Sequence, residues 1–192
     1  MSSTTGKNKA PLDAYYTPIA LARACVGTLP LARGEKVWEP HAGGGAFCWA
    51  LSEAGMSVCA SDIDADAIAL RTPHGGAHFY GVADALGGFP FPGVRPAWVV
   101  GNPPFTDVEK HIDAALSVAV IGVGFLLRLA VLEGQKRKEA WKHWPLKSVH
   151  VLVERPSFTG GGTDSAAYGF FYFEHGHTAK PVIDWLSWRG GQ

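Results

Sequence analysis

The stretch Trp38-Glu39-Pro40-His41-Ala42-Gly43-Gly44-Gly45-Ala46-Phe47 decides the fold. We predict a short strand over Lys36–Trp38 before the glycines and a helix over Ala46–Glu53 after them. Glycine permits backbone conformations that other residues avoid, and it lets a ligand approach the main chain closely. A helix N-terminus adds amide donors at the same place. The stretch therefore predicts a strand–turn–helix unit with a ligand site at its turn.

Strands and helices alternate on both sides of this unit, which indicates parallel βαβ connections. The further predicted strands are Ser57–Ala60, His78–Gly81, Ala97–Val100, Gly124–Leu132, Val149–Val153 and Gly169–Glu174, with Pro181–Trp185 as a weaker candidate. The further predicted helices are Ile19–Val26, Ala65–Leu70, Val108–Val118 and the basic Gln135–His143. Thr17-Pro18 should start the first helix with a hydroxyl cap followed by proline. We expect an α/β three-layer sandwich with a mostly parallel seven-strand sheet and an antiparallel C-terminal hairpin.

The length of 192 residues, 47% of them hydrophobic, suits one globular domain. Residues 1–12 are small and polar, so we expect a disordered tail followed by a single domain over residues 13–192. The three cysteines have no metal-ligand spacing and are expected to be free thiols. The apolar run over residues 114–127 is too short to span a bilayer. These features predict a soluble, cytoplasmic protein with no membrane association.

The formal net charge is zero, which argues against strong non-specific binding to nucleic acid. A local basic excess lies between Arg128 and Lys147. Lys136, Arg137 and Lys138 in this segment are candidates for contacts with a phosphate backbone. A solvated helix face explains the same charges equally well.

An acid follows the glycine turn at the end of the next strand. Asp62 stands where a carboxylate can accept hydrogen bonds from the ribose hydroxyls of a nucleoside cofactor. The turn itself reads ExxxGxG through Glu39, Gly43 and Gly45, unlike a dinucleotide fingerprint or a phosphate loop. A carboxylate at position 39 would repel a pyrophosphate but would suit a cationic amino-acid group. The pattern favours S-adenosylmethionine over NAD or ATP.

A second motif carries the chemistry. The apolar strand over Ala97–Val100 runs into Gly101 and then into Asn102-Pro103-Pro104-Phe105. The Asn102 amide oxygen and the Pro103 carbonyl can accept both hydrogens of an exocyclic base amine and stabilise the positive charge that develops as the amine is methylated. The two prolines fix the direction of that carbonyl, and the Phe105 ring offers a stacking face worth roughly 1–3 kcal/mol. The alternative is a strand that ends in a Pro-Pro turn with a buried phenylalanine.

Over residues 14–175 the chain resembles class I amino-methyltransferases, specifically the small DNA N6-adenine methyltransferases of phages and prophages. The resemblance implies that Tyr16, Thr17 and Pro18 lie near the methionine end of the cofactor. It also implies that Asp62 and the adjacent Ile63 bind the ribose side of the cofactor, and that Asp84 contacts its adenine amine. By the same resemblance Glu39, Gly43 and Gly45 form the glycine motif, and Asn102, Pro103, Pro104 and Phe105 are the catalytic motif. His41 receives no role.

The tail Arg155-Pro156-Ser157-Phe158 followed by residues 163–174 is similar to the tail of the phage-type enzymes. The resemblance implies that Phe158 stacks on the flipped target base and that Arg155 lies at the DNA, together with Lys136, Arg137 and Lys138. No separate target-recognition domain is expected, which predicts a short or relaxed recognition sequence. The glycine loop 160–162 and the basic segment are what remains to contact DNA, unless a homodimer or a partner supplies a further element.

The sequence thus predicts S-adenosylmethionine-dependent methyl transfer to the N6 amine of adenine in DNA that is single-stranded or has its base flipped out. No metal is expected, because the eight histidines are scattered. Two alternatives stay open within the same chemistry: a ribosomal RNA substrate and a protein glutamine amide. A third alternative is a non-catalytic cofactor-binding subunit.

Overall fold

A computed structural model of the chain describes residues 16–67, 79–158 and 165–189. The predicted disordered tail at residues 1–12 and the glycine loop 160–162 lie outside these ranges. In the predicted helix over Ala65–Leu70, residues 65 and 66 form a turn, and residues 68–70 also lie outside the described residues. Within the described part, no helix is long and apolar enough to cross a membrane.

The strands form one mixed sheet in the order β3-β2-β1-β4-β5-β7-β6-β8. All neighbouring pairs are parallel except β5–β7 and β6–β7. Their bounds are β1 Lys36–Glu39, β2 Ser57–Asp62, β3 Phe79–Val82, β4 Trp98–Gly101, β5 Gly122–Arg128, β6 Leu146–Leu152, β7 Tyr168–Glu174 and β8 Val182–Leu186. The expected parallel sheet and antiparallel hairpin are confirmed.

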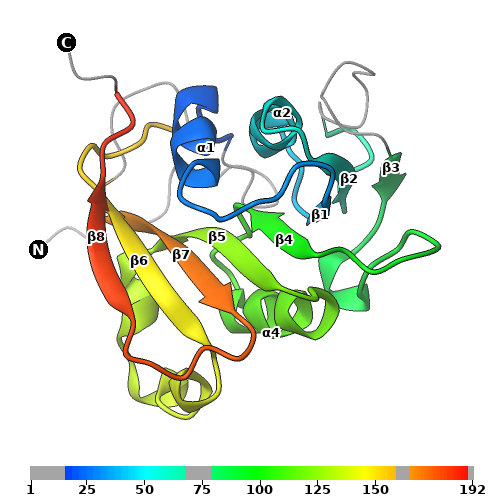
Figure 1. Cartoon of the computed structure of the whole chain (residues 1–192). Coiled ribbons are helices and arrows are strands. Elements are labelled where there is room, and N and C mark those ends of the chain that lie inside the picture. Colours follow the sequence, from blue (N-terminus) through cyan, green and yellow to red (C-terminus); the bar gives the residue numbers. More distant parts are fainter. Residues whose placement is uncertain (1–15, 68–78, 159–164, 190–192) are drawn as a thin grey trace, which may run out of the picture.

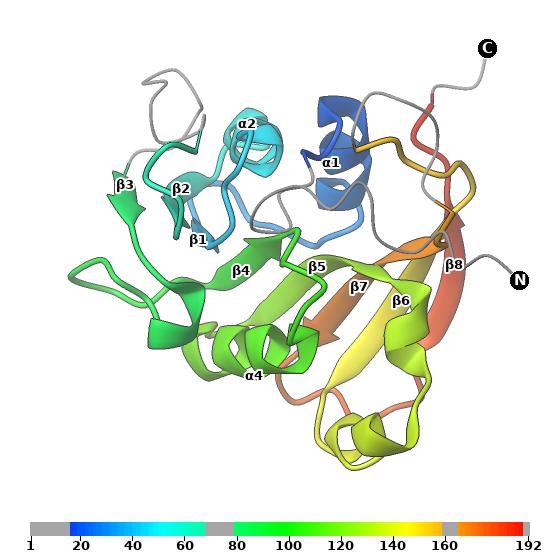
Figure 2. The ribbon, with the colours of Figure 1, turned by 180° about the vertical axis from the view of Figure 1, so that it is seen from behind.

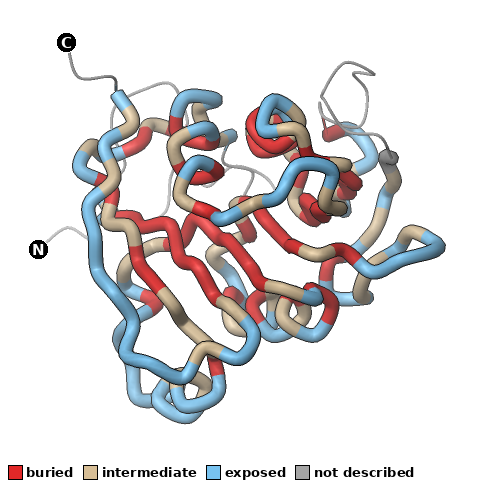
Figure 3. Tube along the Cα trace, viewed as in Figure 1, coloured by how far each residue is buried: buried red, intermediate tan, exposed pale blue. Residues whose placement is uncertain are grey.

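The count of seven strands was wrong, because the weakest candidate forms an eighth. Strand β8 pairs in parallel with β6, with Val149 opposite Ile183 and Val151 opposite Trp185. It forms one edge of the sheet, where its residues remain largely exposed (Figure 3). Its sequence is apolar apart from Asp184, yet Val182, Ile183 and Trp185 stay exposed at this edge.

Helices cover both faces of the sheet. Helices α1 (Ile19–Val26) and α2 (Ala46–Glu53) pack on one face, and α4 (Val108–Val118) packs on the other (Figures 1 and 2). The alternation along β1 shows why both faces are covered: Val37 belongs to the core beneath α1 and α2, whereas Trp38 belongs to the core beneath α4. Residues one apart on a strand point to opposite faces, so buried residues on both sides produce the three layers.

The basic segment is not the continuous helix that its sequence predicts. It forms two short 3-10 turns, Gln135–Arg137 and Ala140–Lys142. Tertiary contacts override helix propensity here. The Trp141 ring stacks on Phe173 at a centroid distance of 6.4 Å, and the Trp144 indole nitrogen donates to Asp113 at 2.7 Å. These two anchors tie the segment to the sheet and to α4.

Two further boundaries differ from the predictions. Strand β5 ends at Arg128, and Leu129–Leu132 form a 3-10 turn instead of continuing the strand. Pro18 itself takes the cap position directly before α1, so the predicted hydroxyl cap by Thr17 was wrong. The Thr17 hydroxyl has another partner, described below.

The topology fixes the position of a binding site. From β1 the chain adds β2 and β3 on one side, and then returns to add β4 and β5 on the other. In open α/β sheets, ligands bind in the crevice at the carboxyl ends of the strands where the strand order reverses. That crevice lies here between the ends of β1 and β4, where the glycine turn and the Asn102–Phe105 motif begin.

Candidate active site

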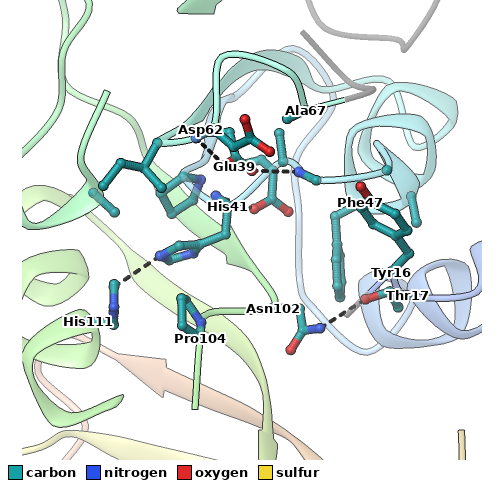
Figure 4. Close-up of a pocket in the computed structure, with 18 of the residues that line it drawn as sticks. Tyr16, Thr17, Glu39, His41, Phe47, Asp62, Ala67, Asn102, Pro104 and His111 are labelled. Carbon is teal, nitrogen blue, oxygen red and sulfur yellow. Dashed lines mark hydrogen bonds between the residues drawn. The ribbon is translucent and has the colours of Figure 1, made fainter. Parts of the chain in front are cut away.

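A cavity of about 280 Å³ lies at this switch point. The volume is near the lower end of the range for ligand pockets, which is roughly 300–1,000 Å³. Its lining includes these predicted residues: Tyr16, Thr17, Glu39, Gly43, Asp62, Ile63, Asp84, Asn102 and Pro104 (Figure 4). Thr17 and Asn102, which are 85 positions apart in the chain, meet here. The structure therefore brings most of the predicted cofactor residues, with Asn102 and Pro104 of the predicted catalytic motif, to one cavity. Four other predicted residues are not part of its lining: Pro18, Gly45, Pro103 and Phe105.

The glycine turn is shaped by two left-handed residues. Gly43 has φ +43° and Gly45 has φ +83°, a region of backbone conformation that favours glycine. The Gly43 amide donates a hydrogen bond of 2.8 Å to the Asp62 carboxylate. The Tyr16 ring packs against the turn, 3.2 Å from the place where a Cβ on Gly44 would lie. The turn is thus fixed on one side by β2 and on the other by the segment before α1.

Asp62 has a structural as well as a potential binding role. Its second carboxylate oxygen accepts from the Asp64 amide at 2.9 Å. Each carboxylate oxygen has a second lone pair, so hydroxyl groups of a ribose can still donate to both. Asp84 follows β3 and accepts from the Leu86 amide at 2.9 Å, with its side chain exposed at the cavity. The two acids are therefore oriented by backbone amides before any ligand arrives.

Glu39 is the buried acid of the site, with a residue exposure of 1%. Its carboxylate accepts from the His41 amide at 2.9 Å and lies against Gly101, where any side chain would collide with it. Burial raises the pKa of Glu39 well above its usual range, and the nearby negative charge of Asp62 adds to the increase. A buried carboxyl that lines a cavity next to a second acid provides a binding position for a cation.

A pair of histidines that the sequence did not indicate also lines the cavity. His41 Nε2 and His111 Nδ1 lie 3.0 Å apart and share a hydrogen bond (Figure 4). Burial lowers the pKa of His41 well below its usual range, and His111 lowers it further. Burial also lowers the pKa of His111, against opposing contributions from Asp84 and Asp107. Both rings are therefore neutral at neutral pH. His111 comes from α4, and no motif spacing links it to His41.

Asn102 lines the cavity and lies directly after β4. Its amide nitrogen donates to the Thr17 hydroxyl at 3.2 Å, so its oxygen lies on the side away from Thr17 (Figure 4). This bond is the partner that the Thr17 hydroxyl takes instead of capping α1. Pro103 is buried and Pro104 lines the cavity. The Asn102 side chain is thereby oriented to accept a hydrogen bond through its oxygen.

Phe105 lies beside a cluster of rings. The Arg128 guanidinium lies over the Phe105 ring, with Cζ 4.0 Å from the ring centroid. The centroids of Phe105 and Tyr168 are 5.7 Å apart, and those of Phe158 and Tyr168 are 5.2 Å apart. Phe158 is 9% exposed and packs into the core, apart from the cavity lining that the described residues form. Its stacking on a target base stays a prediction.

The predicted phosphate contacts differ from one another in their surroundings. Arg137 pairs with Glu109 and donates to the backbone oxygens of Ala130 and Glu133. It therefore holds the basic segment against α4. Lys136 and Lys138 on the same segment are exposed, as is Arg155 after β6. Among the described residues, no group of three His, Cys, Asp or Glu side chains is placed to hold a metal ion.

No protein-family model and no curated protein matches the sequence. Solved structures do match, at low identity. The M protein of the type I restriction enzyme EcoKI aligns with a TM-score of 0.69 and 15% identity, over 88% of this chain and 46% of that one. A proposed RNA methyltransferase from Pyrococcus horikoshii aligns with a TM-score of 0.62 and 18% identity, over 90% and 93%.

A third match is magnesium protoporphyrin IX methyltransferase from Synechocystis PCC 6803 with bound S-adenosylmethionine. It has a TM-score of 0.56 and 14% identity, over 81% of this chain and 76% of that one. The matched structures act on different substrates by their names, so what they share with this chain is the architecture. The chain has the fold of class I S-adenosylmethionine-dependent methyltransferases.

Proposed function

We propose that this protein binds S-adenosylmethionine in the cavity and methylates the exocyclic N6 amine of adenine in DNA, with a short or relaxed sequence preference. The observation that supports this most is that residues suited to the cofactor and a residue suited to the target amine lie in one cavity. Three acids, Glu39, Asp62 and Asp84, line the cavity together with the oriented amide of Asn102. A protein that only bound the cofactor would need no side chain that accepts amine hydrogens next to the cofactor residues.

The residues present fit the cofactor. Asp62 faces the cavity with lone pairs suited to the ribose hydroxyls, and Asp84 stands at the next strand end for the adenine amine. Glu39 is a buried carboxyl with a raised pKa, which a cationic amino-acid group would stabilise in its charged form. A carboxylate at Glu39 would repel the pyrophosphate of NAD and the phosphates of ATP. When bound, S-adenosylmethionine supplies an electrophilic methyl group on a sulfonium.

The chain's own groups then act on the target amine. The amine nitrogen is a weak nucleophile because its lone pair is delocalised into the ring. The Asn102 oxygen and the Pro103 backbone carbonyl accept its two hydrogens, which favours a tetrahedral nitrogen and stabilises the positive charge that develops. The Thr17 hydroxyl holds the Asn102 amide in the orientation that this requires. The target base must leave the duplex, or come from a single strand, to reach these acceptors.

An adenine in DNA is favoured over other planar amines by the resemblance of Asn102–Phe105 and the tail to the phage-type enzymes. Ribosomal RNA and a protein glutamine amide present the same kind of nitrogen and are the alternatives. A non-catalytic subunit would need no Asn102 held by Thr17, which argues against that reading.

A transfer assay distinguishes these substrates. The protein is incubated with methyl-labelled S-adenosylmethionine and, in parallel, single-stranded DNA, double-stranded DNA, ribosomal RNA and unfolded protein. We expect label in DNA, with the single strand at least as good a substrate as the duplex. Label in RNA alone or in protein alone would show that the substrate is that molecule and not DNA. No label in any of them, despite cofactor binding by calorimetry, would overturn the enzymatic function.

A further inference from the structure

Arg128 lies beside the catalytic motif although it is distant from that motif in the chain. It is the last residue of β5, and β5 pairs in parallel with β4, where Gly101 is opposite Phe125. Strand β5 therefore extends past the end of β4, and Arg128 lies along the same sheet edge as Asn102 and Phe105. Its sequence position shows only that it belongs to a basic stretch.

Two aromatic rings and a hydrogen bond hold the guanidinium. Its Cζ lies 4.0 Å from the centroid of Phe105 and 5.9 Å from that of Tyr168. Its Nε donates to the Tyr168 hydroxyl at 3.1 Å. Tyr168 is itself only 1% exposed and packs edge-to-face on Phe158. The guanidinium is thus restrained in position over the face of Phe105.

Core stability alone does not explain this arrangement. A partly buried cation loses hydration, and an apolar side chain of similar volume would fill the same space without that cost. A guanidinium stacked on a ring does fix the ring, because the planar cation attracts the ring face and resists rotation. The ring that it fixes is the one directly after Asn102-Pro103-Pro104.

We propose that Arg128 is a positioning residue of the target site. It covers one face of Phe105 and holds the ring in the plane in which the opposite face stacks on the target base, against the acceptors Asn102 and Pro103. The inference rests on the proposed function, since it assigns Phe105 a base-stacking role. The planar shape of the Arg128 guanidinium and its hydrogen bond to Tyr168 should matter more for this role than its charge.

Three variants separate these properties. R128K keeps the charge but loses the planar stacking and the geometry of Nε. R128M removes the charge and keeps an apolar stem of similar length. Y168F removes only the hydroxyl that accepts from Arg128. The exposed Arg33, in the loop before β1, provides R33K as the matched control.

Steady-state kinetics are measured on the nucleic acid that the wild-type protein methylates, together with cofactor affinity by calorimetry and the melting temperature. R128K and R128M should each lower kcat on the order of 10- to 100-fold, as misplaced reacting groups do. Cofactor affinity should remain within a factor of about two, since Arg128 is separate from the cofactor cavity. Y168F should show a smaller loss of kcat, and R33K none.

Wild-type kcat in R128K would show that charge alone suffices and would overturn the proposal. A raised KM for nucleic acid with unchanged kcat would overturn it in favour of a phosphate contact. If R128M melts far below the wild-type protein, Y168F gives the deciding result, and an unchanged kcat there overturns the proposal as well. A wild-type protein that methylates no nucleic acid would instead overturn the proposed function, and this inference with it.

Discussion

The Asn102 amide nitrogen donates to the Thr17 hydroxyl across 3.2 Å, which joins residues that are 85 positions apart in the chain. Thr17 lies just before α1, and α1 packs on the face of the sheet opposite α4. The bond therefore couples the position of α1 to the orientation of the Asn102 amide. It also fixes which end of the amide can accept a hydrogen bond.

Replacing Thr17 tests that coupling. Thr17→Val is nearly isosteric but cannot accept the amide hydrogen, so the Asn102 side chain should lose its fixed orientation. We expect kcat to fall about 10-fold, the effect of about 1.4 kcal/mol of lost hydrogen bonding in the transition state. Thr17→Ser keeps the hydroxyl and should retain most of the activity. Equal kinetics for the valine and serine variants would show that this bond does not orient Asn102.

The Glu39 carboxyl should lower the stability of the ligand-free protein and strengthen cofactor binding. The pKa of Glu39 is higher in the folded than in the unfolded protein. The protonated carboxyl therefore contributes to the free energy of unfolding below the unfolded pKa, and this contribution is lost as pH rises through the folded pKa. An ionised Glu39 therefore destabilises the ligand-free protein at neutral pH. Glu39→Gln keeps the oxygen that accepts from His41 and removes the charge.

We expect E39Q to melt at a higher temperature than the wild-type protein at neutral pH. The increase should be about 2–4 °C for each kcal/mol of charge-burial cost that the substitution removes. The difference should shrink towards acid pH. Its affinity for S-adenosylmethionine should weaken by about 1.5–3 kcal/mol, the worth of a bond to a charged group. Scanning calorimetry and titration calorimetry measure the two effects. Stability and affinity that fall together would argue against a buried binding carboxylate.

The sequence predicts the site better than it predicts how the site is held. Asp62, Asp84 and Asn102 each lie at the carboxyl end of a strand in the parallel part of the sheet, and such ends lie along one edge. Their convergence was therefore predictable from local patterns. The His41–His111 pair and the Arg128–Phe105 contact depend on the placement of α4 and on the length of β5. Local patterns carry no signal for either, and they also suggested a helix where Trp141 and Trp144 anchor two 3-10 turns.

The His41–His111 pair should make the fold sensitive to acid. The pKa of His41 is lower in the folded than in the unfolded protein. The stability that the neutral ring contributes is therefore present above the unfolded pKa and is lost as pH falls towards the folded pKa. The melting temperature should therefore fall between about pH 7 and about pH 5, where an unfolded histidine takes up its proton. His111 and His150 shift in the same direction and contribute as well.

His41→Asn should reduce the slope of melting temperature against pH over this range, whereas His143→Asn, at an exposed position, should leave it unchanged. Differential scanning calorimetry across a pH series measures both slopes. A slope in the His41 variant identical to that of the wild-type protein would remove this residue from the acid response.

The basic segment should contribute fewer phosphate contacts than its three basic residues suggest. Lys136 and Lys138 are exposed, but Arg137 is bound to Glu109 and to two backbone oxygens. Lys136→Gln with Lys138→Gln should lower the salt dependence of DNA binding by a slope of roughly 2, without loss of stability. Arg137→Gln should chiefly lower the melting temperature. Fluorescence anisotropy over a salt series would contradict this if the double lysine variant kept the wild-type slope.

The most direct test of the account is the identity of the methylated nucleoside. DNA is incubated with the protein and S-adenosylmethionine that carries a deuterated methyl group, then digested to nucleosides and analysed by mass spectrometry. We predict deuterated N6-methyldeoxyadenosine. With Asn102→Ala its yield should fall on the order of 10²- to 10³-fold, the effect of removing one preorganised transition-state partner, while cofactor affinity is retained. A label on any other atom, or undiminished N6-methylation by the Asn102→Ala variant, would contradict the account.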